Sequence, residues 1–126
     1  MVVAALFHDI GEVFSPGNHG SIASALLRPF VSPVIYWVLD KHEIFQGYYY
    51  FHHVGGDRHQ RDVFKDHPYY QETVDFCHRW DQSSFDMGYP SMNESEFLPL
   101  VYEVFSTPAY MFDADNPKKM ASFANL

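Results

Sequence analysis

A histidine and a carboxylate stand side by side at His8-Asp9, directly after the apolar run 2–7. Such a pair at a helix end can ligate two neighbouring metal ions, because imidazole nitrogen and carboxylate oxygen are both ligands for iron, manganese and zinc. Three more residues of ligand type occur singly further along: His19, His42 and Asp81. The types of these five residues predict a metal centre.

The elements that must position these residues are predicted to be helices joined by Pro- and Gly-rich loops, since few alternating patterns favour strands. The expected fold class is all-α. The predicted helices are 2–13, 18–28, 32–47, 69–84 and 94–105. The last is allowed only if Pro99 lies in or near the first turn. The stretch 48–65 is expected to be a long loop with helical pieces, one of them at 57–64.

Helical periodicity places the single ligand-type residues on buried faces. Apolar residues lie three, four and seven positions after His19, and others lie four and seven positions before Asp81. A third set stacks below His42 on the same face of its predicted helix. A lone inward-facing histidine is more often a hydrogen-bonded core residue than a ligand. Taken together, however, inward groups on four separate helices favour a di-metal centre between them.

Composition limits the function classes. The 126 residues, 47% of them hydrophobic, suit one compact domain, assigned to 1–106, with a weakly ordered tail at 107–126. A formal charge of −8 disfavours nucleic acid and anionic membrane surfaces as partners. Cys77 is the single cysteine, which excludes an intrachain disulfide and favours a reducing, cytoplasmic compartment.

The ordered set His8-Asp9-Ile10-Gly11, His19, His42 and Trp80-Asp81 resembles the HD-domain superfamily over about residues 2–86. It is most similar to the mixed-valent di-iron oxygenases, which include inositol oxygenase and the phosphonate-cleaving oxygenases. The resemblance implies an HD-domain helical bundle that holds two iron ions. It also implies that a small polar organic substrate is oxidised by O2.

The resemblance also implies a role for each ligand. His8 and Asp81 would bind one iron, His19 and His42 the other, and Asp9 would bridge the two as the catalytic carboxylate. The family's first histidine has no counterpart, because only seven residues precede His8. We therefore expect the HD domain to be N-terminally incomplete.

Three further positions carry substrate contacts by the same resemblance: Glu12, Gln46 and His78. Similar oxygenases place basic or polar residues there. Because this chain replaces most of these cationic anchors and has an acidic group at Glu12, we expect a neutral or cationic substrate rather than a phosphonate.

Two alternatives stay open. Many HD-domain proteins are phosphohydrolases in which Mn²⁺, Zn²⁺ or another divalent metal activates water for attack on a nucleotide or small phosphate ester. The scarcity of Lys and Arg near the predicted ligands argues against phosphate, which favours such partners. A degenerate HD fold that acts as a binding module is the non-enzymatic alternative.

Overall fold

The computed structural model describes residues 1–106 and 108–110, and within them the chain is helical, with no strand. The α-helices are α1 (Val2–Phe7), α2 (His19–Leu27), α3 (Pro33–Tyr50), α4 (Tyr70–Phe76) and α5 (Glu94–Ser106). Short 3₁₀ turns lie at Ile10–Val13, Pro16–Asn18, Phe51–Val54, Gln60–Phe64 and Gln82–Phe85, and a π-helical turn lies at Cys77–Asp81. The all-α prediction is confirmed.

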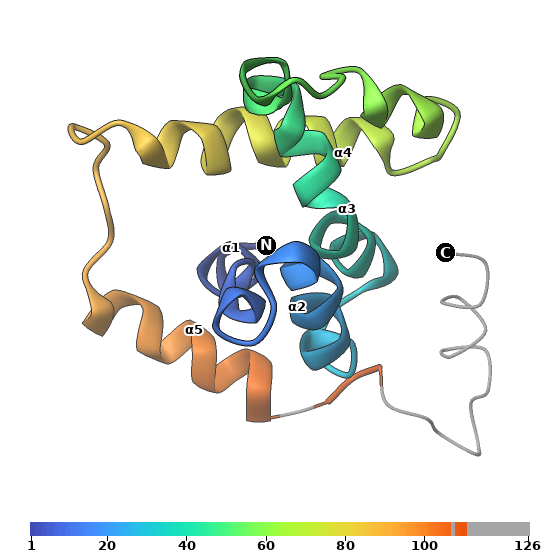
Figure 1. The fold of residues 1–126 in the computed structure, drawn as a ribbon. Helices are drawn as coiled ribbons and strands as arrows, with labels where there is room; N and C mark the ends of the chain where they lie inside the picture. The colour runs from blue at the N-terminus through green and yellow to red at the C-terminus, as the bar shows by residue number, and fades with distance from the viewer. Residues whose placement is uncertain (107, 111–126) are drawn as a thin grey trace.

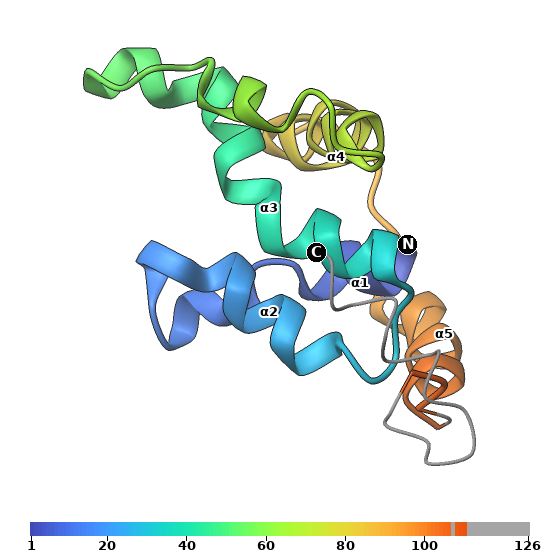
Figure 2. The ribbon, with the colours of Figure 1, turned by 90° about the vertical axis from the view of Figure 1, so that its right-hand side faces the viewer.

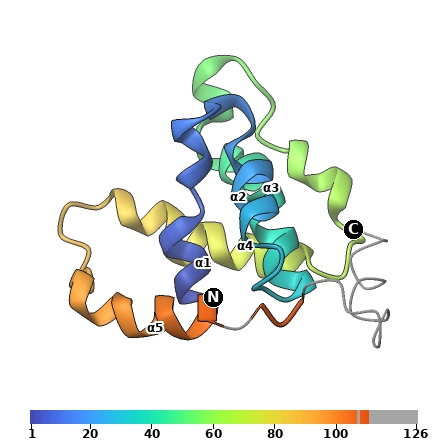
Figure 3. The same ribbon diagram turned by 90° about the horizontal axis from the view of Figure 1, so that it is seen from below.

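Helix α3 connects the two halves of the structure. It packs against α2 on one side and against α4 on the other. Figure 1 shows α4 and its continuation crossing above α1 and α2, and Figure 2 shows α2 running beneath the first half of α3. Seen from below, in Figure 3, α5 lies alongside the start of α1, with which it is in contact.

Two apolar clusters flank α3. Leu39 belongs to the first, where it packs with buried residues of α1, α2 and the connection to α3: Ala4, Leu27 and Val31. Val38 and Phe45 belong to the second, where they pack with Phe76 and Cys77. Burial of apolar surface is the main driving force for packing, so the two clusters together hold α3 from both sides. Its polar residues between the clusters are fixed with it.

The first predicted helix, 2–13, is wrong in extent, because α1 ends at Phe7 and a 3₁₀ turn follows at Ile10–Val13. The backbone of Gly11 lies directly against the backbone of His19, where a Cβ would collide with it. A continuous α-helix would carry this segment away from α2. The break after α1 therefore brings His8, Asp9 and the start of α2 together.

Helix α3 begins as predicted, with Pro33 in its first turn, although the predicted N-cap Ser32 makes no side-chain cap hydrogen bond. The helix continues three residues past Gly47, into the segment predicted as a loop. Tyr49 packs against the apolar cluster around Val38 and Phe45, which gives this last turn a buried partner. Helical pieces are present in this segment as 3₁₀ turns at Phe51–Val54 and Gln60–Phe64, and the second begins three residues later than the predicted piece 57–64.

The predicted helix 69–84 is present but is not uniform. Regular α-helix spans Tyr70–Phe76, and the π turn Cys77–Asp81 and a 3₁₀ turn continue it to Phe85. A π turn inserts one residue into the helical repeat and shifts the side chains that follow, a feature frequent at functional sites. Asp81, the last residue of that turn, is only 7% exposed, so its predicted inward orientation is confirmed.

The last helix, α5, contains Pro99 at its sixth residue, beyond the first turn that the sequence analysis required. Proline cannot donate to the carbonyl four residues earlier, but α5 has no buried residue, so water can satisfy that carbonyl. The helix is attached through Phe105, whose ring meets those of Phe7 and Phe30 edge-on at 5.6 and 4.8 Å. Most of the predicted tail, 107 and 111–126, lies outside the described residues.

Candidate metal centre

The three histidines of the predicted set are oriented by the same type of hydrogen bond to the backbone. Nδ1 of each ring lies within hydrogen-bond distance of the backbone carbonyl three residues earlier, at 2.7 Å for His8, 2.9 Å for His19 and 2.7 Å for His42. A carbonyl can only accept, so each Nδ1 carries the proton. Each Nε2 is then free to act as a ligand, which is the arrangement that metal-binding histidines commonly use.

The Nε2 atoms converge on Asp9, and its two oxygens face different rings. Oδ2 lies 3.1 Å from Nε2 of His8. Oδ1 lies 3.1 Å from Nε2 of His19 and 3.4 Å from Nε2 of His42, and these two nitrogens are 3.0 Å apart. One carboxylate thus divides the histidines into a single ring on one side and a pair on the other.

Asp81 lies next to His8, the single histidine that faces Oδ2 of Asp9. Its Oδ1 lies 3.6 Å from Nε2 of His8, and the π turn brings it there from the far side of α3. The structure therefore brings together all five residues that the sequence analysis singled out: His8, Asp9, His19, His42 and Asp81. Within the part of the chain that the structure describes, two overlapping groups have donor atoms near enough to hold a metal ion: His8, Asp9 and His42, and Asp9, Glu12 and His19.

The surroundings of Nε2 of His8 also suit a metal ion. Nε2 of His8 is buried and makes no hydrogen bond of good geometry among the described residues, although two carboxylates lie close to it. A buried nitrogen that faces two carboxylates needs a positive charge beside it, either a proton or a metal ion. A cation between this nitrogen and the carboxylates would satisfy all of them at once, so a divalent metal suits the donor set.

The electrostatics of the site reflect the crowding of carboxylates around imidazoles. Burial of the His8 ring opposes its charged form, but Asp81 and Asp9 outweigh burial and raise the pKa of His8 from 6.5 to about 10. Burial acts to raise the pKa of Asp9, but His42 and His8 outweigh it and hold that pKa well below its usual range. Asp9 therefore stays ionised, as a bridging ligand must.

Glu43 is a site residue that the sequence analysis missed. Its Oε1 lies 2.8 Å from Nδ1 of His19, and its Oε2 accepts a hydrogen bond of 3.2 Å from the backbone N–H of Gly20. The sequence offered one signal, the spacing of three between Glu43 and Asp40, which places both carboxylates on one helix face. The structure shows that this face contacts α2, since Asp40 accepts a hydrogen bond from Ser21. The apolar stripe of α3 gave no reason to include it.

The three predicted substrate residues lie in different places. Glu12 is exposed beside Asp9 and His19. Gln46 is buried and donates a hydrogen bond of 2.9 Å to Gln82. His78 is exposed, with Nδ1 3.1 Å from the hydroxyl of Tyr49. A substrate contact at any of the three stays a prediction.

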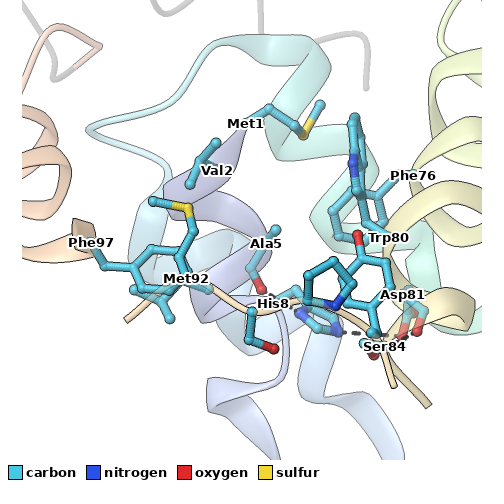
Figure 4. A pocket seen from close by; sticks show the side chains of 14 residues that line it. Met1, Val2, Ala5, His8, Phe76, Trp80, Asp81, Ser84, Met92 and Phe97 are labelled. Atoms are coloured by element: carbon cyan, nitrogen blue, oxygen red, sulfur yellow. Dashed lines mark hydrogen bonds and ion pairs between the residues drawn. The ribbon is translucent and has the colours of Figure 1, made fainter. Parts of the chain in front are cut away.

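A cavity of about 470 Å³ borders the cluster on the side of His8 and Asp81. Figure 4 shows these two side chains at one edge, with Phe76 and Trp80 on one wall and Met92 and Phe97 opposite. Most of the lining is apolar, and among the residues that the structure describes no Lys or Arg contributes to it. Glu12, Gln46 and His78 are not among the lining residues.

Comparisons with known proteins identify no relative: no family model matches the chain, and neither does any curated protein or solved structure. Among the described residues, no helix is both long and apolar enough to cross a membrane.

Proposed function

We propose that the chain is a metal-dependent enzyme of the HD-domain type, whose centre oxidises a small organic substrate with O2. The observation that carries the proposal is the division of the histidines by Asp9, whose Oδ2 faces His8 and whose Oδ1 faces His19 and His42. A carboxylate with donors gathered at each oxygen can bridge two metal ions. A carboxylate that only stabilised one buried histidine would need no second group of donors.

This division is consistent with the ligand roles that the resemblance implies. His8 and Asp81 would hold one metal, His19 and His42 the other, and Asp9 would bridge. Donors of nitrogen and oxygen without a thiolate suit iron, manganese or zinc, and the resemblance to the di-iron oxygenases favours two iron ions. When bound, such a pair would supply the activation of O2 and the oxidation of the substrate. The chain itself would fix both ions, keep Asp9 ionised and shield His8 and Asp81 from water.

Charge around the centre favours an oxygenase over a phosphohydrolase. The side chains within reach of the five proposed ligands include the carboxylates of Glu12 and Glu43, and the described residues that line the adjoining cavity include no Lys or Arg. Phosphate sites favour Arg or Lys, and the described residues of this lining offer neither. A neutral or cationic substrate meets no such penalty, and contacts with Glu12, Gln46 or His78 remain part of the proposal.

The test is the metal content and magnetic state of the protein. We expect protein purified with iron and then partly oxidised to hold about two irons per chain and to give the low-temperature EPR signal of a coupled ferrous–ferric pair. One metal ion per chain, or zinc at full occupancy, with phosphate release from a panel of phosphate monoesters, would instead support the phosphohydrolase. Protein that takes up no stoichiometric metal from iron, manganese or zinc solutions would support a degenerate binding module.

A further inference from the structure

Glu43 contacts the one proposed ligand whose Nδ1 has two acceptors. Nδ1 of His19 lies 2.9 Å from the carbonyl of Pro16 and 2.8 Å from Oε1 of Glu43. His8 and His42 have one backbone carbonyl each at this position. The His19 ring is therefore placed between a full negative charge at Nδ1 and Asp9 at Nε2.

A purely structural reading of Glu43 is available, because its Oε2 also fixes the start of α2 through the N–H of Gly20. The chain provides a direct comparison. One turn earlier on α3, Asp40 accepts hydrogen bonds of 3.0 Å from Ser21 and 3.4 Å from Ser24, which fixes α2 to α3 without contact to a proposed ligand. Asp40 and Glu43 thus share the structural task and differ in the contact with His19.

We infer that Glu43 is a positioning residue of the metal centre, and this inference rests on the proposed function. A carboxylate beside Nδ1–H holds the ring plane and increases electron donation from the opposite nitrogen. The contact selects His19 alone among the three histidines. We therefore expect Glu43 to strengthen the binding of the metal held by His19 and His42.

The experiment compares wild type, Glu43→Gln and Asp40→Asn, with Zn²⁺ as a redox-inert probe. The amide introduced by Glu43→Gln keeps an oxygen that can accept from Gly20 but loses the charge beside His19. Zn²⁺ affinity, measured by competition with a chromophoric chelator, is expected to fall about 10-fold for one of the two sites in Glu43→Gln, as removal of such a hydrogen-bond partner typically does. Asp40→Asn is expected to keep the wild-type affinity.

A second measurement uses the metal-free protein, so that failure of the inference and failure of the metal centre give different results. In long-range ¹H–¹⁵N spectra, the Nδ1 proton of His19 is expected downfield and protected from exchange in wild type and Asp40→Asn. In Glu43→Gln it should move upfield and exchange faster. Wild-type spectra and affinity in Glu43→Gln, or an equal loss of affinity in Asp40→Asn, overturn the role of Glu43. If no variant binds Zn²⁺, the proposed metal centre falls and the proton signal alone decides whether Glu43 holds His19.

Discussion

Nε2 of His8 lies 3.1 Å from Oδ2 of Asp9, and without a metal this contact requires a proton on Nε2 in addition to the one on Nδ1. Asp81 on the other side adds a second carboxylate, 3.6 Å away. The proton and a metal ion therefore compete for the same nitrogen.

This competition predicts how the stability of the metal-free protein depends on pH. The pKa of His8 is raised from 6.5 to about 10 in the folded state, so protonated His8 contributes stability that is fully present below pH 6.5. The contribution is lost as pH rises through 10. We expect the difference in free energy of unfolding between wild type and His8→Gln, from urea titrations, to shrink across this range. A difference that grows with pH would contradict the proposed environment of His8.

The same proton predicts the pH dependence of metal binding. Because a ligand histidine must be neutral at Nε2, apparent Zn²⁺ affinity should increase with pH as His8 loses its proton. Calorimetry in buffers of different ionisation enthalpy should show proton release on binding at pH 7. In His8→Gln the released proton should be missing, and unchanged proton release in that variant would exclude His8 as a ligand.

The bridging position of Asp9 predicts different metal stoichiometries for its variant and for a variant of Asp81. Asp9→Ala removes the oxygens that face both groups of histidines, so iron content is expected to fall toward zero. Asp81→Ala removes a ligand from one side only, and about one iron per chain is expected to remain, bound by His19 and His42. Metal analysis by mass spectrometry distinguishes these outcomes, and full occupancy in Asp9→Ala would falsify the bridge.

The contact between Gly11 and His19 predicts a selective effect of added volume. A Cβ at position 11 collides with the backbone of His19. Gly11→Ala should therefore destabilise the fold by about 1–3 kcal/mol, the usual cost of overpacking, and should weaken metal binding through displaced His19. The matched control is Gly17→Ala, in the next 3₁₀ turn, where a Cβ would have no neighbour within 4 Å. Thermal unfolding should occur at a lower temperature in Gly11→Ala than in Gly17→Ala. Equal stability of the two variants would contradict the close contact between Gly11 and His19.

The ring contacts of Phe105 predict that this residue holds α5 against the rest of the fold. Its ring contacts Phe7 and Phe30, whereas Tyr102 on the same helix is 74% exposed. Phe105→Ala should cost about 2 kcal/mol and raise amide exchange along α5, since the apolar contact is lost. Tyr102→Ala should leave exchange unchanged. Because Phe97 of α5 lines the cavity, substrate affinity is also expected to fall in Phe105→Ala with metal content retained.

The helical class and the five residues of the candidate metal centre could be predicted from the sequence. Both depend on local rules, because a period of 3.6 residues fixes which side chains share a face and residue type fixes which atoms can bind a metal. The periodicity of the apolar residues predicted the inward orientation of Asp81 correctly. It did not predict the π turn that positions this side chain.

The arrangement of these residues around Asp9 could not be predicted in the same way. The end of α1 before His8, the approach of Gly11 to His19 and the contact of Glu43 with Nδ1 each depend on where a distant segment lies. The same is true of the cavity between α1, the π turn and α5. Periodicity describes one element at a time, whereas the assignment of each Asp9 oxygen to a histidine results from packing between elements.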